Sequence, residues 1–411
     1  MKKYLALALV GCMTMTLLGG CGGSQTAATD AAASASATDA ATSAGTSPST
    51  GTTTGAGAAT AEGAGTQTAD PSGTDGAKAA FDAIVKAAQE EGELLVMGGG
   101  GANEVDIVQD GFKKEFGVDI KVSYIPGSQA KIIAQLQMEQ EAGATPSYDF
   151  IPASADNLMK AKAAGVIEDV DWKQLLDGAG LNPNYYTGLP ADYISAEATI
   201  RGIVYNNTLV DANELPKTLG DFTDPKWKGQ FGWLSFANQS VECLYFQDMI
   251  NDDGQQFIKD ILANEPSLEN NDSMAVKVSL GELKFGYLSS QDYLRILETD
   301  PNTPLRFQIL DDYVMISEGS WNVVKGCEHP NAAKLLALWY CTPSGIDYTR
   351  LSAGSRDLWN PETPETSYLA DAEAVGAKVI WVSRQGEYLE WLGTDEAADF
   401  LAKISAIYKG E

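Results

Sequence analysis

The sequence ELLVMGGGGANEVDIVQDGFKKEF, residues 93–116, decides the fold. Leu94–Met97 is an apolar run of the length expected for a buried strand. Glycines follow it, and the apolar residues of Val105–Phe116 then recur with the spacing of a helix. Such a turn brings the unpaired N–H groups of a helix start to the end of a sheet, where they attract anions and polar groups. The stretch predicts either a tight turn without a ligand or a ligand site, formed by Gly99, Gly100, Gly101 and Asn103.

Two further strand–helix units follow in the sequence. Val118–Tyr124 alternates apolar and polar residues as a strand does, and a helix capped by Ser128 comes next. Tyr148–Ile151 and Ala155–Ala164 repeat the pattern. Three such units predict a parallel sheet with ligands at the carboxyl ends of its strands. The polar residues expected at that edge are Ser128, Gln129 and Ser154.

The first residues have the features of an export signal. Lys2 and Lys3 precede the apolar run Tyr4–Leu18, which is too short to span a membrane as a mature helix. The ending Leu-Gly-Gly-Cys resembles the lipobox of bacterial lipoproteins, in which the cysteine is lipidated and becomes the new N-terminus. We therefore expect a signal peptide over residues 1–21 and a lipid on Cys21; the alternative is an ordinary secretory signal with a chance cysteine.

Residues 22–77 consist mainly of Ala, Gly, Ser and Thr and show no apolar periodicity. Such a segment cannot bury enough apolar surface to offset its chain entropy, so it is expected to be a disordered tether. A lipid and a tether would place the folded part outside the cell, anchored to the outer face of a bacterial membrane. The roughly 330 residues that remain are enough for two domains.

Composition argues against several classes of protein. Asp and Glu outnumber Lys and Arg by 56 to 28, which disfavours nucleic-acid binding. The three cysteines after Cys21 have no CxxC spacing, so neither a disulfide framework nor a zinc site is supported. His329 is the only histidine and is expected in a solvated loop, and no nucleophile or phosphate-loop motif occurs. We predict that the chain is not an enzyme and has neither a cofactor nor a metal site.

Three segments after residue 200 carry a family resemblance. They are Tyr205–Val210 (YNNTLV), Leu215–Lys217 (LPK) and Asp224–Gly229 (DPKWKG). In this order they resemble the extracellular solute-binding proteins of bacterial ABC importers, in the branch that binds ferric iron, thiamine, putrescine and phosphonates. The similarity covers about residues 93–354. It implies a type 2 periplasmic-binding-protein fold: two α/β lobes, with mixed sheets flanked by helices, two crossover strands and a cleft that closes on the ligand.

The resemblance also implies a division of the chain and a second set of contacts. Lobe 1 would comprise residues 78–198 plus 318–364, and lobe 2 residues 199–317 plus 365–411. Lobe 2 contacts would lie before the helical stretch Val241–Ile250 and in the segment Leu288–Tyr293. Arg356 either faces the cleft or forms an ion pair with an acidic residue. The expected contacts from these regions are Asn238, Ser240, Gln291, Asp292 and Arg356.

The nature of the ligand is only partly constrained. Ferric-binding relatives hold iron with adjacent tyrosines, whose position here falls at Gln291-Asp292; Tyr185-Tyr186 lies in the wrong register. Iron is therefore not expected, and a solute bearing a phosphate, phosphonate or carboxylate leads. A polyamine, a thiamine-like ring or a sugar stays open, because acidic and aromatic residues are available. These are Asp292, Asp312, Tyr124, Trp233, Tyr287, Tyr293 and Trp321.

The resulting hypothesis is a membrane-anchored solute-binding protein that captures a small molecule and delivers it to an ABC transporter permease. It is expected to act as a monomer. A surface adhesin and an enzyme are the alternatives from other classes. An adhesin would show no closure on a ligand, and an enzyme would show turnover.

Overall fold

The computed structural model describes residues 74–98, 102–235 and 237–411. The expected signal peptide, Cys21 and nearly all of the expected tether lie outside the described residues, as do Gly99, Gly100 and Gly101. The side chain of Asn238 is likewise outside the description.

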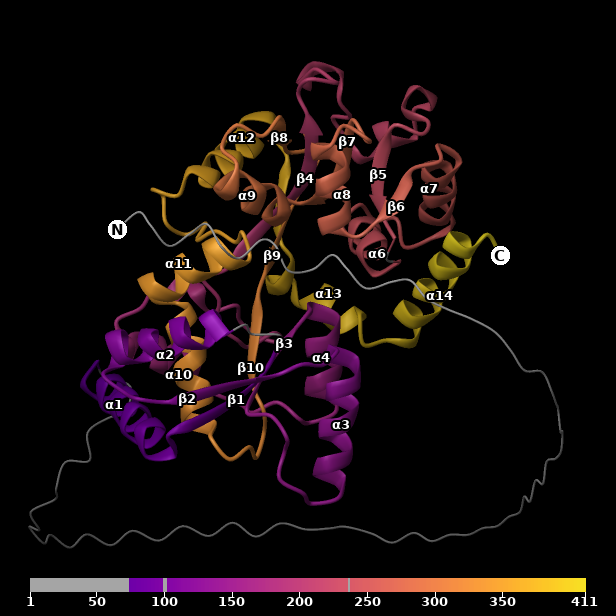
Figure 1. Ribbon diagram of the computed structural model, residues 1–411. Coiled ribbons are helices and arrows are strands. Elements are labelled where there is room, and N and C mark those ends of the chain that lie inside the picture. Colours follow the sequence, from indigo (N-terminus) through magenta and orange to yellow (C-terminus); the bar gives the residue numbers. More distant parts are fainter. Residues whose placement is uncertain (1–73, 99–101, 236) are drawn as a thin grey trace, which may run out of the picture. The chain divides into compact units, whose positions relative to one another are not determined.

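The first sheet has the strand order β10-β3-β1-β2 (Figure 1). Strand β1 is parallel to β2 and to β3, with Val96 opposite Tyr124 and Phe150, as the repeated strand–helix units predict. Strand β10 joins the edge antiparallel to β3, although it lies far away in sequence. The strands are β1 Glu93–Met97, β2 Lys121–Ile125, β3 Phe150–Ala153 and β10 Ser320–Val323.

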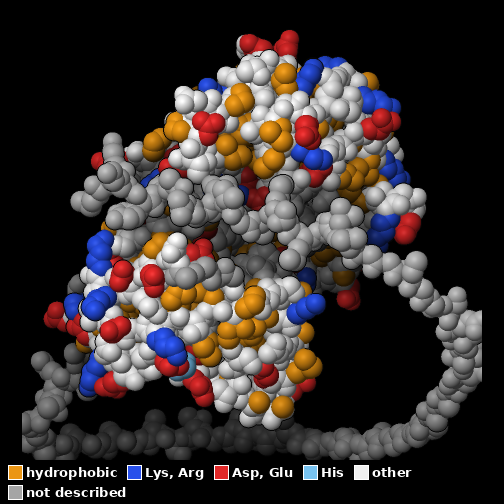
Figure 2. All heavy atoms as spheres, in the orientation of Figure 1, with side chains coloured by type: hydrophobic (Ala, Val, Ile, Leu, Met, Phe, Trp, Pro, Cys, Tyr) orange, Lys and Arg blue, Asp and Glu red, His pale blue; other side chains and the backbone are white. Residues whose placement is uncertain are grey.

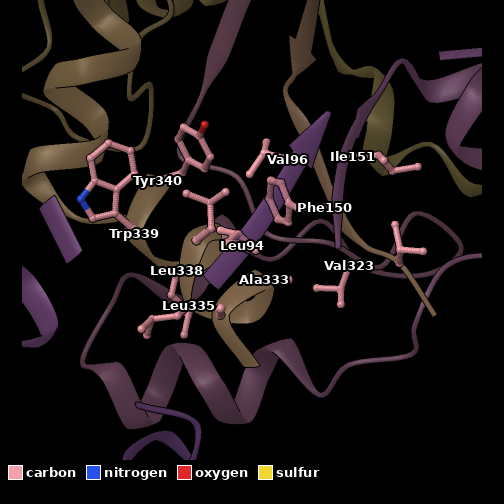
Figure 3. Close-up of a cluster of buried hydrophobic side chains, with 14 of the residues drawn as sticks. Leu94, Val96, Phe150, Ile151, Val323, Ala333, Leu335, Leu338, Trp339 and Tyr340 are labelled. Carbon is pink, nitrogen blue, oxygen red and sulfur yellow. The ribbon is translucent and has the colours of Figure 1, made fainter. Parts of the chain in front are cut away.

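The core of this half is built on the two apolar faces of the sheet. Leu94 and Phe150 from the strands and Trp339 from α10 are almost fully buried (Figure 3). Each helix has an apolar face and a polar face, and the apolar face can cover the sheet. They are α1 Thr74–Glu91, α2 Ala102–Phe116, α3 Gln129–Glu141, α4 Ala155–Ala163, α5 Trp172–Ala179, α10 Pro330–Tyr340 and α11 Pro343–Ser352.

The second sheet has the order β11-β9-β4-β7-β5-β6, with β8 also paired to β4. Strand β4 pairs antiparallel with β7, with β8 and with β9, whereas β5 runs parallel to β6 and β7. The strands are β4 Ala198–Asn206, β5 Phe231–Leu234, β6 Ser267–Glu269, β7 Phe285–Ser289, β8 Leu305–Gln308, β9 Tyr313–Glu318 and β11 Lys378–Trp381. The sheet is therefore mixed.

An aromatic cluster fills the centre of this second half. The Phe222 ring lies 5.3 Å from that of Trp233 and 5.6 Å from that of Tyr287. Trp233, Tyr287 and Tyr293 are buried, so these three expected cleft aromatics belong to the core. The helices here are α6 Ala237–Tyr245, α7 Asp252–Ala263, α8 Asn271–Ser279, α9 Ser290–Thr299, α12 Ser367–Val375, α13 Gly386–Trp391 and α14 Asp395–Lys409.

The chain passes between the two sheets at a narrow junction. Strand β9 ends at Glu318 in the second sheet, and β10 begins at Ser320 in the first, with only Gly319 between them. At this level Ala198, the first residue of β4, pairs with Glu318. Two α/β halves joined by crossing strands confirm the predicted fold class. The exact division of residues between lobes stays a proposal.

Several predicted boundaries are corrected. Helix α1 begins at Thr74, so residues 74–77 do not belong to a tether; Ala77 is buried, and its carbonyl lies against Gly178 of α5. The helix predicted to reach Ile250 ends at Tyr245, and Asp248 then adopts a positive φ of 57°. The positions at which these two helices begin and end depend on tertiary contacts, which the apolar periodicity of the sequence does not indicate.

His329 does not lie in a freely solvated loop. Its Nδ1 is 2.8 Å from the buried Asp149 carboxylate, and its backbone N–H donates to the same side chain. This contact anchors the start of α10 to the first sheet.

On the face shown in Figure 2, basic and acidic side chains intermingle across both halves. No helix among the described residues is both long enough and apolar enough to cross a membrane.

Candidate functional site

A cavity of about 540 Å³ opens where the two halves of the chain meet. Helix α4 and the crossover segment form one wall. The second sheet, helix α6, the starts of α8 and α9 and the C-terminal helices form the rest. Its polar lining residues are Ser154, Asp156, Lys160, Glu197, Thr199, Arg201, Glu242, Asn271, Ser289, Gln291, Ser317, Glu318, Ser383 and Tyr388.

Arg201 is the buried cation of this cavity. It lies on β4 two residues after Thr199, and alternation along the strand brings both side chains to the cavity wall. Only 7% of Arg201 is exposed. Its guanidinium lies 3.9 Å from the Glu242 carboxylate and 5.9 Å from the centre of the Tyr287 ring. The strand register fixes Arg201 opposite Ser289, at the start of α9.

Three helices begin at the cavity. Ser154 precedes α4, Asn271 is the first residue of α8, and Ser289 caps α9 by accepting a hydrogen bond from the Gln291 N–H. Helix starts carry unpaired N–H groups and the positive end of the helix dipole. Together with Arg201, they make this cavity suited to an anionic group.

Carboxylates on the wall are mostly matched by cations. Glu318, whose side chain is fully buried, lies 2.8 Å from Arg384, and Asp156 lies 3.2 Å from Lys160. Burial raises the pKa of both Glu242 and Glu318, while Arg201 and Arg384 respectively oppose this rise. Carboxylate oxygens are strong acceptors, so the same wall can receive hydroxyl groups of a ligand.

Two predicted ligand contacts line the cavity, Ser154 and Gln291. Gln129 does not line the cavity but contacts residues at the start of α4. Its side-chain oxygen accepts hydrogen bonds from the Ser154 N–H at 3.0 Å and from the Asn157 side-chain amide at 3.0 Å. Gln129 therefore positions the start of α4. Ser128 is exposed and caps α3 without a side-chain hydrogen bond, and Asn103 is exposed near the start of α2.

Ser240, Asp292 and Arg356, which were also predicted as ligand contacts, do not line this cavity. Arg356 lies 3.1 Å from both Glu298 and Glu365, and its backbone pairs with Ala198. The ion-pair alternative therefore describes it. The hydroxyl of Ser240 contacts that of Tyr408 at 2.5 Å.

Asp292 does not line the cavity, although its neighbour Gln291 does. Its Oδ1 accepts a hydrogen bond from Arg295 at 2.6 Å, while its Oδ2 is buried without a hydrogen-bond partner. Burial, followed by the nearby Asp272 carboxylate, raises the pKa of Asp292 to about 7. Successive helical residues point about 100° apart, so Gln291 can reach the cavity when Asp292 cannot.

The adjacent tyrosines are structural. The Tyr185 hydroxyl donates to Asp357 at 2.8 Å, and the Tyr186 hydroxyl donates to Asp192 at 3.0 Å. Neither lines the cavity. Among residues 74–98, 102–235 and 237–411, no group of three or more His, Cys, Asp or Glu side chains is placed to hold a metal ion.

Sequence reasoning missed the charged residues of the wall. Arg201 carried one available signal, because it is a lone charge inside the apolar segment ATIRGIVYN. A buried charge needs a partner or a function, so its position alone marks it as a candidate. Glu197, Glu242 and Glu318 carried no comparable signal, since Glu is common on exposed surfaces.

The fold and the cavity between its halves define a binding protein. Residues 107–352 match the family of bacterial extracellular solute-binding proteins. The chain belongs to this family, which confirms both the predicted class and the prediction that it is not an enzyme.

Among individual proteins, the chain is similar to iron-binding ones. The Fe(3+)-binding periplasmic protein of Serratia marcescens is 23% identical over 274 residues, which are 64% of this chain and 78% of that protein. The major ferric iron-binding protein of Neisseria gonorrhoeae is 21% identical over 164 residues, 39% of this chain and 47% of the relative. The chain thus spans about half the length of the Neisseria relative.

Solved structures show the same fold. Iron-bound HitA from Pseudomonas aeruginosa superposes with a TM-score of 0.61 at 18% identity, covering 77% of this chain and 99% of HitA. The periplasmic binding protein AfuA from Actinobacillus pleuropneumoniae, solved with fructose-6-phosphate bound, gives a TM-score of 0.54 at 16% identity over 77% and 98% of the chains. At these identities the likeness concerns the fold alone.

Proposed function

We propose that this protein captures an anionic organic solute in the cavity between its halves and delivers it to the permease of an ABC importer. The observation that carries the proposal is the buried Arg201 guanidinium beside the starts of α4, α8 and α9. Backbone N–H groups and a guanidinium bind phosphate, phosphonate and carboxylate oxygens by charge-assisted hydrogen bonds. Lobe 1 at 78–198 plus 318–364 and lobe 2 at 199–317 plus 365–411 would close on the solute.

The wall also favours hydroxyl groups on the solute. Serine hydroxyls, the amides of Asn271 and Gln291, and the carboxylates of Glu242 and Glu318 supply acceptors and donors around the cation. The volume of about 540 Å³ falls within the range of small-molecule pockets. A phosphorylated or carboxylated polyol fits this set better than an iron ion, because among the described residues no three His, Cys, Asp or Glu side chains are grouped to hold a metal.

Calorimetry of the purified protein tests this function. Glycerol 3-phosphate and citrate serve as anionic probes, glycerol as the uncharged control, and ferric chloride with nitrilotriacetate as the iron probe. Native mass spectrometry of freshly purified protein identifies any solute carried from the cell. The proposal is supported if an anionic probe binds and neither glycerol nor iron prevents its binding. Tight binding of iron with a visible ferric–tyrosinate band would contradict it.

Membrane attachment is a separate part of the proposal. Cys21→Ser removes the thiol that the expected lipid would modify, and we expect the full-length variant to move from the membrane fraction to the soluble one. A single acyl chain gives only marginal membrane binding. Stable anchoring requires at least two chains, and the lipidated cysteine of a lipoprotein carries more than one. The measurement is cell fractionation with mass spectrometry of the N-terminal peptide. Membrane retention of Cys21→Ser would contradict lipidation at this residue.

A further inference from the structure

A second cavity of about 290 Å³ opens beside the first sheet. The aromatic part of its wall comes from the carboxyl end of β2, from β10 and from helices α10 and α11. The aromatic residues are Tyr124, Trp321, Tyr340 and Tyr348. The Trp321 ring is stacked on that of Tyr340, with ring centres 4.3 Å apart and planes 8° apart. Glu104, near the start of α2, adds a carboxylate to the same wall.

Glu197 is shared by the two cavities. It lines both the cavity that contains Arg201 and the aromatic one. It lies immediately before β4, and its backbone carbonyl accepts a hydrogen bond from the Gly319 N–H at the crossover. Glu197 therefore forms part of the wall of both cavities, at the junction where the chain passes between its halves.

The Glu197 carboxylate differs from the others in the first cavity. Its oxygens accept hydrogen bonds from the Ser355 hydroxyl at 2.7 Å and from the Trp321 indole N–H at 3.2 Å. Both donors are neutral. Among the described residues, no Lys, Arg or His lies within ion-pair distance of Glu197, whereas Asp156, Glu242 and Glu318 each have a cation.

Such an arrangement has an energetic cost without a ligand. Burial raises the pKa of Glu197, because the charged form loses hydration that two neutral hydrogen bonds replace only in part. A cation entering from the aromatic side would form the missing ion pair. The faces of Trp and Tyr rings also attract cations through their quadrupoles, most strongly where water is excluded.

We propose that Glu197 and the aromatic side chains of the second cavity bind a cationic group of the solute, while its anionic group binds beside Arg201. The solute is then a zwitterion, with an ammonium or protonated heterocycle separated from a phosphate, phosphonate or carboxylate. This inference rests on the proposed function, since it assigns the other end of the same ligand. The cavity that contains Arg201 would then bind the anionic group, and the aromatic cavity would bind the cationic group through Glu197.

Two isosteric probes separate the contribution of the cation from that of shape. Phosphocholine carries a quaternary ammonium, and 3,3-dimethylbutyl phosphate replaces that nitrogen by carbon. A series of ω-aminoalkyl phosphates of increasing length, each beside the alkyl phosphate of equal length, covers other separations of the charges. In calorimetry with the wild-type protein, we expect the cationic member of the best-fitting pair to bind at least about tenfold more tightly.

Glu197→Gln tests the residue itself. The Gln side chain can accept a hydrogen bond from the Trp321 indole N–H and donate one to the Ser355 hydroxyl. The variant is therefore expected to keep its fold, which a melting curve checks. We expect the preference for the cationic probe to disappear while the neutral alkyl phosphate binds as before. Glu168→Gln is the matched control: it removes the same charge from the first half, where Glu168 pairs with Lys334 outside both cavities.

The outcomes distinguish this inference from the function on which it rests. If alkyl phosphates bind and the ammonium gives no advantage at any length, or if the advantage survives in Glu197→Gln, the cation site is wrong and the anion site stands. A protonated Glu197 that donates a hydrogen bond to a ligand oxygen would give the ammonium no advantage, so it predicts the first of these two results. If neither series binds, both the inference and the anionic-solute function are overturned.

Discussion

Replacing Arg201 and Glu242 together by Gln is expected to weaken the binding of an anionic solute roughly tenfold to a hundredfold. A hydrogen bond to a charged group contributes about 1.5–3 kcal/mol, and about 1.4 kcal/mol corresponds to a factor of ten. Both residues are changed because Arg201→Gln alone would leave the Glu242 carboxylate buried without its cation. Calorimetry with glycerol 3-phosphate measures the change.

Arg306→Gln is the control for this experiment. Arg306 lies exposed on β8, opposite Tyr205 of the same strand that carries Arg201, and does not line the cavity. Arg306→Gln removes one positive charge from the second half, whereas the double variant removes one charge of each sign and leaves the net charge unchanged. The control therefore reports how far the loss of a distant cation by itself weakens anion binding. Equal weakening in Arg306→Gln and in the double variant, or wild-type affinity in the double variant, would place the anion site elsewhere.

The local patterns of the first half were sufficient to predict its parallel strands. Leu94–Met97 and the apolar residues of α2 are each local patterns in the sequence, so their periodicity indicates a strand and a helix directly. The position of β10 beside β3 depends on a partner about 170 residues earlier, with which Trp321 pairs opposite Pro152. Such a pairing is not contained in any local window. The resemblance to a family supplied that part of the fold.

The candidate site was less predictable than the fold. An expected helix start pointed to Ser154, because helix caps follow local rules, whereas Gln291 was predicted from the family resemblance. Whether Asp292 or Gln291 faces the cavity depends on the rotation of α9, which packing fixes. Glu197 and Glu318 stand out only because they are buried at the crossover, where burial raises the pKa of each carboxyl group. A sequence shows the residue type but not its exposure.

Trp339→Ala is expected to lower the free energy of unfolding by about 3–5 kcal/mol, the usual cost of truncating a buried large aromatic side chain. Trp339 is 1% exposed and lies between α10 and α2 in the core of the first half. Its indole N–H has no hydrogen-bond partner among the described residues, so the loss is one of packing. Urea unfolding followed by far-UV circular dichroism measures it.

Gly111 of α2 provides the internal test of this explanation. A Cβ at Gly111 would lie 2.2 Å from the Trp339 Nε1, so Gly111→Ala should destabilise the wild-type protein although Ala favours a helix over Gly by about 1 kcal/mol. In the Trp339→Ala background the obstructing ring is gone, and the same change should stabilise by about that amount. Its effect thus reverses sign. Destabilisation by Gly111→Ala in both backgrounds would mean that contacts other than the Trp339 ring determine the spacing of α2 and α10.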